Sequence, residues 1–157
     1  MEARLDLFAS PVAGKILKHF TAAGRAVKEA GLPDSTRELV LLRASQINGC
    51  GFCVDMHTKD AAAAGETAQR LHLVAAWREV TVFTDAERAA LELTEHGTRI
   101  ADGAGGVPDE VWANAAKHFD ENQLIGLVAS IAAINAFNRF NVIVQQPAGW
   151  YQPGQFA

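Results

Sequence analysis

The most informative stretch of the chain runs from Glu38 to His57 and has the sequence ELVLLRASQINGCGFCVDMH. Its first half carries apolar residues at helical spacing and ends in Asn48-Gly49, a common helix C-terminus. A second helix is expected to begin at the Cys50-Gly-Phe-Cys53 pair. Because residues three and four apart share one face of a helix, Cys50, Cys53 and His57 are expected to point the same way. The stretch therefore predicts two consecutive helices that present two thiols and an imidazole together.

The rest of the chain carries the same periodicity. Apolar residues recur at spacings of three and four, and alternation of period two is almost absent, so the sequence predicts an all-α fold. Two segments begin with the Ser/Thr-x-x-Glu pattern of a capping box, at Ser35-Thr-Arg-Glu38 and at Thr84-Asp-Ala-Glu87. The expected helices cover residues 12–30, 35–48, 51–64, 67–77, 84–101 and 121–137, with a short helix after Pro108.

Neither a linker nor a composition break divides the chain. We therefore expect a single-domain helical bundle over residues 1–157, with 141–157 as a C-terminal docking tail too rich in Pro and Gly to continue the helix. The last long helix has no charged residue between Glu121 and Arg139, so it is expected to be central or to form a subunit contact. Three aromatic residues of the tail are expected to dock on a neighbouring surface: Trp150, Tyr151 and Phe156. Together these features predict a homo-oligomer.

The charge and hydropathy pattern exclude several kinds of protein. The chain has 14 Lys and Arg against 18 Asp and Glu, a formal net charge of -4, and no basic run, so a nucleic-acid partner is not expected. The first residues lack the long apolar stretch of a secretory signal, and no segment approaches the roughly 18 apolar residues of a membrane span. We therefore expect a cytoplasmic protein with no membrane partner.

The cysteine pair is suited to redox chemistry. A bridge between residues three apart closes too small a loop to stabilise a fold, but helical spacing puts their Cα atoms about 5 Å apart, where a disulfide can form. A thiol with a pKa of about 8.5 is about 3% ionised at pH 7, and a pKa of about 6.5 raises that to roughly 75%. The helix N-terminus and His57 are expected to stabilise the thiolate, with Glu38 orienting His57 and accepting its proton.

The residues alone leave other interpretations open. The two cysteines can pack as small apolar side chains, or Cys50, Cys53, His57 and Glu38 can form a zinc ligand set, although no further cysteine is present. Glu38 is also the fourth residue of the Ser35 pattern and can simply cap its helix. Cys53 is favoured as the attacking thiol because His57 lies one turn away. The opposite order, with Cys50 attacking, stays open because the first cysteine of such a pair at a helix start is often the more exposed.

The combined motif resembles the alkylhydroperoxidase D-like (AhpD-like) core of the carboxymuconolactone decarboxylase family. The residues that carry the resemblance are Glu38, Asn48, Cys50, Cys53, His57 and Thr58-Lys-Asp-Ala61, and the similarity extends from about Val12 to Asn141. It implies an all-helical enzyme, assembled as a trimer or hexamer, in which the cysteine pair reduces an organic hydroperoxide or hydrogen peroxide. It also implies a proton relay through Glu38 and His57, and re-reduction by an external dithiol protein such as a lipoyl domain. We expect no bound cofactor and no metal.

One residue departs from the best-studied branch of the family, which has a second histidine between the cysteines where this chain has Phe52. We expect either a slower peroxidase or an apolar mouth that favours organic hydroperoxides over hydrogen peroxide. Two other functions stay open. One is a lactone decarboxylase acting on a carboxylated aromatic-degradation intermediate, as in other members of the wider family, and this lyase chemistry does not need the thiols. The other is a non-enzymatic redox sensor whose cysteine pair controls assembly or binding.

Overall fold

The computed structural model describes residues 2–103 and 105–156, and within these ranges it contains helices and no strand. Seven α-helices and two short 3-10 helices (η) follow in the order α1 (Pro11–Ala26), η1 (Val27–Ala30), α2 (Asp34–Ile47), α3 (Gly51–Ala63), α4 (Ala68–Leu73), η2 (Val74–Glu79), α5 (Asp85–Thr98), α6 (Asp109–Ala116) and α7 (Glu121–Val144). The predicted all-α fold class is confirmed.

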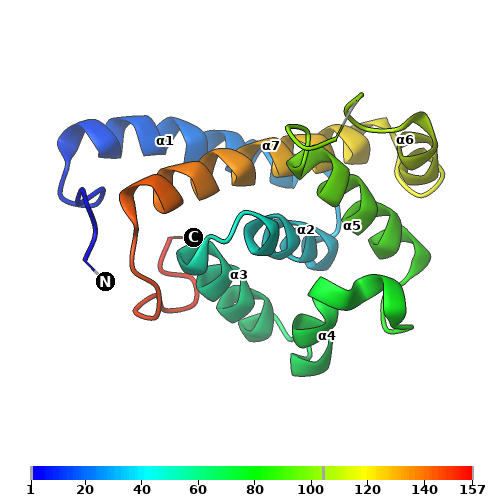
Figure 1. Cartoon of the computed structure of the whole chain (residues 1–157), viewed down its shortest axis with the longest axis horizontal. Coiled ribbons are helices and arrows are strands. Elements are labelled where there is room, and N and C mark those ends of the chain that lie inside the picture. The colour runs from blue at the N-terminus through cyan, green and yellow to red at the C-terminus, as the bar shows by residue number, and fades with distance from the viewer. Residues whose placement is uncertain (1, 104, 157) are drawn as a thin grey trace.

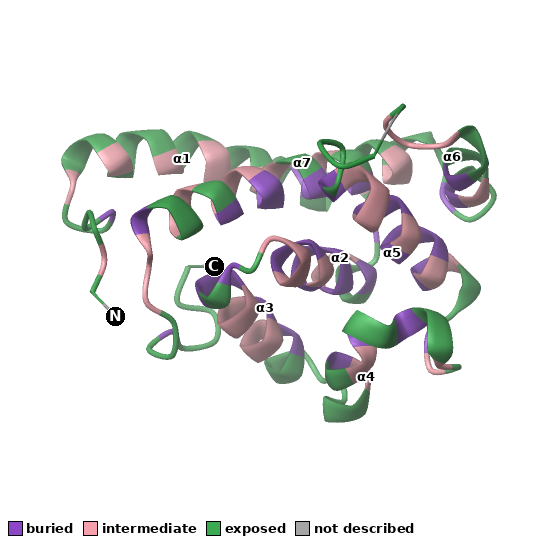
Figure 2. Ribbon diagram, in the orientation of Figure 1, coloured by how far each residue is buried: buried purple, intermediate pink, exposed green. Residues whose placement is uncertain are grey.

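Helix α2 lies at the centre of the molecule because its apolar side chains point in three directions. Its run Leu39-Val40-Leu41-Leu42 contributes to three separate apolar clusters. Val40 packs towards α5, α6 and α7, Leu39 and Leu42 towards α3, α4 and η2, and Leu41 towards α7 and the start of α3. Figure 2 shows buried positions concentrated on α2 and α5. Helices α3, α5 and α7 therefore all pack against α2.

Helices α1 and α7 run alongside each other on one long edge of the molecule (Figure 1). The two approach closely where Gly126 of α7 meets the turn after α1, since a Cβ at this position would lie 2.7 Å from the Ala30 Cβ. Only glycine fits there without a shift. Helix α1 has no buried residue, and Figure 2 shows it exposed along most of its length. One side of the long edge is thus open to solvent.

The two predicted capping boxes have different outcomes. At α5 the prediction is confirmed, because Thr84 Oγ1 accepts from Glu87 N at 3.2 Å and Glu87 Oε2 accepts from Thr84 N at 2.8 Å. At α2 it is wrong: the helix begins at Asp34, with Pro33 at the N-cap and no side-chain cap. The helix starts one residue earlier than expected, so Ser35 lies inside the first turn and cannot act as the cap.

The last helix is longer than predicted. It continues past Phe137 to Val144 and ends at Gln145, which has a left-handed conformation with φ 58. The β-branched residues at 142–144 each cost a helix only about a few tenths of a kcal/mol relative to Ala. The first residue that strongly disrupts a helix is Pro147. Residues 141–144 therefore belong to α7 and not to the expected tail. The segments predicted over 67–77 and 84–101 also differ, since the first turns into the 3-10 helix η2 and the second ends at Thr98.

The length of α7 corrects a second expectation. An 18-residue window of this helix has a mean hydropathy of 1.5, so among the described residues one helix is apolar and long enough to cross a membrane. Length and composition are weak evidence for a span, because the core helix of a soluble protein passes the same test. A third of the window, 33%, is buried inside the protein. Its exposed apolar side chains are Ile125, Val128, Val142 and Ile143.

The C-terminal tail folds back onto α3. Tyr151 is 1% exposed, and its hydroxyl donates to the Asp60 carboxylate at 2.8 Å. Burial and this neighbouring carboxylate raise the pKa of Tyr151 to about 12. Trp150 packs against Phe8 and Phe52, with ring centroids 5.4 and 5.5 Å away. Tyr151 and Trp150 of the tail therefore pack against other parts of their own chain.

Candidate functional site

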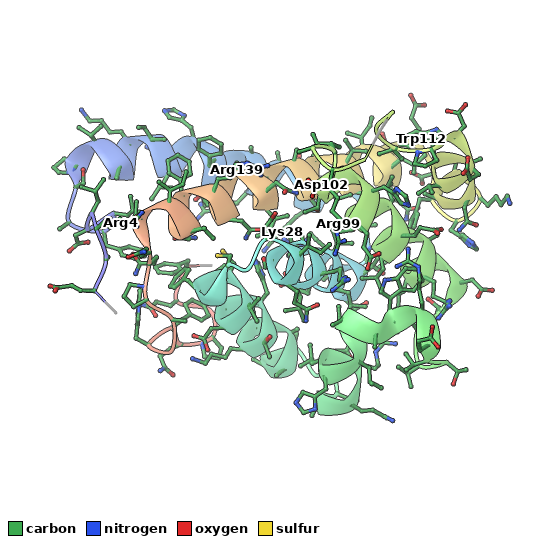
Figure 3. All side chains as sticks on the ribbon, viewed as in Figure 1. Arg4, Lys28, Arg99, Asp102, Trp112 and Arg139 are labelled. Carbon is green, nitrogen blue, oxygen red and sulfur yellow. The ribbon has the colours of Figure 1, made fainter. Side chains whose placement is uncertain are left out.

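The two cysteines lie where α2 ends and α3 begins. Gly49 closes α2 with φ 66, a left-handed conformation that glycine adopts without strain. Cys50 then takes the N-cap position of α3, where its Sγ accepts from Cys53 N at 3.3 Å, as a serine or aspartate would. Both thiols are free and 1% exposed. Figure 3 draws sulfur in yellow at the start of α3.

His57 and Glu38 meet across the gap between α3 and α2. His57 Nδ1 and Glu38 Oε2 are 2.9 Å apart, and the other carboxylate oxygen, Oε1, lies 3.1 Å from Arg37 Nη2. The predicted contact between Glu38 and His57 is therefore present, although sequence alone could not place the two helix ends together. The carboxylate that fails to cap α2 is directed at the imidazole. Its role in catalysis is a prediction.

The electrostatics of the pair favour an ionised carboxylate. Burial acts to raise the pKa of Glu38, but the hydrogen bond and charge of His57, together with the cations Arg37 and Lys28, outweigh it and lower that pKa. His57 is 7% exposed, and its second nitrogen, Nε2, is buried with no hydrogen-bond partner among the described residues. A buried nitrogen without a partner is costly. Glu38 thus holds Nδ1 of the imidazole, and Nε2 is left without a hydrogen-bond partner among the described residues.

Asn141 of α7 is a site residue that the sequence interpretation missed. Its Nδ2 donates to Cys53 Sγ at 3.3 Å. The residue was assigned to the tail because α7 was expected to end near Phe137. A signal was nevertheless present: Asn135, Asn138 and Asn141 recur every three residues in the mostly apolar second half of the helix, so one helix face carries amides.

These amides form a buried network that joins α7 to α2. Asn48 Nδ2 donates to both Asn135 Oδ1 and Asn138 Oδ1 at 2.9 Å, and Asn138 Nδ2 donates to Ser45 Oγ at 3.1 Å. Buried amides with satisfied hydrogen bonds hold their neighbours in one arrangement. The network therefore fixes the position of α7, and with it Asn141, relative to the cysteine pair.

The two thiols differ in acidity. The hydrogen bond from Cys50 lowers the pKa of Cys53 to about 7 despite burial, with further help from the Asn141 and Asn138 amides and the charge of His57. The same hydrogen bond, burial and the charge of Cys53 raise the pKa of Cys50. With a pKa of about 7, Cys53 is about half ionised at neutral pH. The geometry thus favours Cys53 as the nucleophile and leaves Cys50 with its proton.

Cys53 and His57 both line a cavity of about 1050 Å³ between α1, α2, α3, α7 and the C-terminal tail. Its walls are mostly apolar, and they include Phe8 and Phe52. Phe52 is 5% exposed and packs between Phe8 and Trp150, with ring centroids 6.3 and 5.5 Å away. The residue that replaces the second histidine is therefore part of an aromatic cluster beside the thiols.

The four candidate residues do not form a metal site in this arrangement. Within residues 2–103 and 105–156, no group of three or more His, Cys, Asp and Glu side chains is placed to hold a metal ion. Glu38 is instead bound to His57 and Arg37.

Comparison with known proteins identifies a family and related sequences that match the chain. A model of the carboxymuconolactone decarboxylase family matches residues 14–96. The chain is 45% identical over 115 residues to the uncharacterized protein YdfG of Bacillus subtilis (strain 168), covering 73% of this chain and 77% of that protein.

Two solved structures share the fold. A protein of unknown function from Agrobacterium tumefaciens, described as a candidate antioxidant defence protein AhpD, has 34% identity and a TM-score of 0.86, covering 96% of this chain and 100% of that one. An uncharacterized peroxidase-related protein from Silicibacter sp. TM1040 has 17% identity and a TM-score of 0.70, covering 99% of this chain and 96% of that one.

Proposed function

The chain belongs to the carboxymuconolactone decarboxylase family, and on that premise we propose that it is a thiol peroxidase of the AhpD-like type. The observation that carries the proposal is the environment of Cys53, whose pKa is lowered to about 7 by Cys50 and Asn141. An acidic thiol beside a second thiol is typical of redox-active pairs. The descriptions of the Agrobacterium and Silicibacter proteins, as antioxidant and peroxidase-related, agree with this proposal.

In the proposed reaction the Cys53 thiolate attacks the terminal oxygen of a hydroperoxide, ROOH. The sulfur–oxygen bond forms while the oxygen–oxygen bond breaks, and the departing alkoxide takes up a proton to become the alcohol ROH. Cys53 is then a sulfenic acid. The Cys50 thiol attacks its sulfur, water leaves, and the disulfide forms. Two thiols have lost two electrons, and the hydroperoxide has gained them as alcohol and water.

His57 and Glu38 are proposed to handle the proton in this reaction. His57 lines the same cavity as Cys53, and its Nε2 has no partner among the described residues, so this nitrogen is proposed to hold the proton that the thiol loses. It then returns that proton to the alkoxide. Glu38, 2.9 Å from His57 Nδ1, stabilises the imidazolium that exists between the two transfers.

The apolar cavity favours organic hydroperoxides over hydrogen peroxide. Phe52 and Phe8 place aromatic surface beside Cys53, and an alkyl or aryl group that covers this surface gains binding energy that hydrogen peroxide cannot. The disulfide is proposed to be reduced by an external dithiol protein of the lipoyl type, because the reaction consumes two electrons in each turnover. No bound cofactor is required for these steps.

The assembly and location of the protein are also proposals. Exposed apolar side chains lie on α1 and α7, the two helices of the long edge: Val12, Ile16, Ile125, Val128, Val142 and Ile143. Large exposed apolar side chains gathered on two neighbouring helices are suited to a subunit interface. We propose a homo-oligomer, a trimer or hexamer, in the cytoplasm. Sedimentation of the pure protein tests this, and a monomer would contradict it.

The test of the function is a stopped-flow reaction of the reduced protein with cumene hydroperoxide. The expected result is rapid loss of two thiols per chain, with the Cys50–Cys53 disulfide detected by mass. Cys53→Ser abolishes the reaction, whereas Cys50→Ser stops at a trapped sulfenic acid on Cys53. Thiols that persist in the wild type contradict the proposal.

The same variants separate the alternatives. Lactone decarboxylation that survives in the Cys50→Ser/Cys53→Ser double variant would favour the lyase, because that chemistry does not need the thiols. A disulfide that forms without turnover in the presence of a dithiol reductant would favour the redox sensor.

A further inference from the structure

The cavity beside Cys53 has a cationic region as well as an apolar body. Arg25 at the end of α1, Lys28 in η1 and Arg37 in α2 all line it. Lys28 is labelled in Figure 3. Arg25 and Lys28 are exposed, whereas most of the cavity wall is apolar, so these charged side chains form a distinct part of its lining.

Two carboxylates, Glu38 and Asp60, line the same cavity, and each is engaged by neighbouring groups of the protein. Glu38 is bound to His57 and Arg37, and Asp60 accepts hydrogen bonds from the Tyr151 hydroxyl and Gly154 N. Arg25 and Lys28, by contrast, form no ion pair with a carboxylate in the described part of the chain. Two cations are thus left to interact with whatever enters the cavity.

We infer that the site takes an apolar organic hydroperoxide that carries a carboxylate, with the carboxylate at Arg25 and Lys28 and the hydrocarbon against the walls formed by α1 and α7. This inference rests on the proposed peroxidase function and narrows its substrate class. Charge complementarity at one end and apolar contact along the body are the two features by which proteins orient amphipathic ligands.

Two further observations agree with such a ligand. His57 lines the cavity together with Cys53, and its buried Nε2 has no hydrogen-bond partner among the described residues, so an unsatisfied polar atom lies close to the cavity wall at the reacting end. The cavity volume of about 1050 Å³ is at the upper end for small-molecule sites and leaves room for a hydrocarbon much larger than hydrogen peroxide. In the inferred complex the hydroperoxide group lies at Cys53 and the carboxylate at Arg25 and Lys28, three residues that line the same cavity.

The test compares cumene hydroperoxide with its para-carboxylate, which differ only in the charged group. Rates of thiol oxidation are measured by stopped flow for the wild type and for the Arg25→Gln/Lys28→Gln double variant. We expect the carboxylate to react about fivefold faster than the neutral compound in the wild type, since two partly solvated charge contacts contribute about that factor. In the double variant the ratio falls to about one.

The matched control is Lys15→Gln/Lys18→Gln, which removes two cations from α1 at positions that do not belong to the cavity lining. This variant is expected to retain the fivefold preference. A ratio of one in the wild type would overturn the inference. So would an equal fall in both double variants, because the preference would then come from the overall charge and not from the cavity.

Failure of the peroxidase proposal is distinguished by a binding measurement that involves no redox step. If neither organic compound nor hydrogen peroxide oxidises the thiols, the peroxidase proposal is wrong, and calorimetry with 4-isopropylbenzoate and 4-isopropylbenzamide decides the anion preference. Tighter binding of the benzoate that is lost in Arg25→Gln/Lys28→Gln supports the charged end of the cavity. Equal binding of the two compounds contradicts it.

Discussion

The starts of α2 and α5 carry the same Ser/Thr-x-x-Glu pattern and use its glutamate in opposite ways. At α5, Glu87 turns back to its own helix, caps Thr84 N and pairs with Arg70. At α2, Glu38 turns away from its helix and reaches His57 on α3. A carboxylate bound within its own cap stabilises a helix start. A carboxylate that leaves the cap and meets a buried imidazole is available for chemistry. We therefore expect Glu87 to contribute to stability and Glu38 to contribute to the reaction.

The largest expected effect comes from removing the charge of Glu38. In Glu38→Gln the imidazolium of His57 loses its anionic partner, and we expect thiol oxidation by cumene hydroperoxide to slow about 100-fold, the usual scale for acid–base catalysis. Glu87→Gln is the matched control and is expected to react at the wild-type rate. Stopped-flow rates measure both. If the two variants slow equally, Glu38 has no special role and the comparison fails.

In the free energy of unfolding, the two variants are expected to have the opposite order. Glu87 accepts hydrogen bonds from Thr84 N, the Thr84 hydroxyl and the Arg70 guanidinium, and an amide can replace only part of this set. We expect Glu87→Gln to lower the free energy of unfolding by about 1–2 kcal/mol. Gln at position 38 can still accept from His57 Nδ1, so Glu38→Gln is expected to cost less. Urea unfolding of the two variants measures this, and a larger loss in Glu38→Gln contradicts it.

The third prediction extends the comparison to two asparagines. Asn141 donates to Cys53 Sγ, whereas Asn114 on α6 makes a long hydrogen bond of 3.5 Å to Glu92, away from the thiols. Because Asn141 helps to lower the pKa of Cys53, Asn141→Leu is expected to raise the midpoint of its reaction with iodoacetamide by about half a pH unit. Asn141→Asp places a negative charge beside the sulfur and raises it further.

The control for this experiment is Asn114→Leu, which is expected to leave the wild-type midpoint, near pH 7, unchanged. The alkylation rates are followed between pH 5 and 9, a range that brackets an ordinary thiol pKa, about 8.5. An unchanged midpoint in Asn141→Asp would show that the amide does not act on the thiolate.

The outcome at these helix ends shows what local sequence could and could not predict. The all-α class, the start of α3 at the cysteine pair and the α5 capping box depend on neighbours within one or two turns, and all three are found. The start of α2 depends on a choice between Asp34 and Ser35 that differs by one residue, and the pattern favoured the wrong one. Local patterns fix which residues can cap a helix, and packing decides which of them does.

The residues of the candidate site also differ in whether a local sequence pattern could predict their positions. Cys50, Cys53 and His57 lie on one helix, so their spacing alone placed them together. Glu38 comes from a neighbouring helix, and the resemblance to a family was needed to connect it with His57 before the contact was seen. Asn141 comes from α7, 88 residues further along the chain than Cys53, and the Pro- and Gly-rich segment that follows it suggested an earlier end to that helix. Long-range packing supplied what no local rule contained.

The smallest expected effect is a pH dependence that again divides the two glutamate variants. Burial acts to raise the pKa of Glu87, but the hydrogen bond and charge of Arg70 and the Thr84 cap lower it. A carboxyl group whose pKa is lower in the folded than in the unfolded protein stabilises the fold above its unfolded pKa, about 4.5 or slightly less, and this contribution is lost as the pH falls through its folded pKa.

The Tm of Glu87→Gln is therefore expected to lie about 2–4 °C below that of the wild type at pH 7. That gap is expected to narrow as the pH is lowered below about 4, because the wild-type carboxylate then becomes neutral as well. Thermal unfolding at pH 7, 5 and 3 measures the gap. A gap that is constant over this range would mean that Glu87 stabilises α5 through the shape of its cap and not through its charge, and the contrast with Glu38 would then rest on position alone.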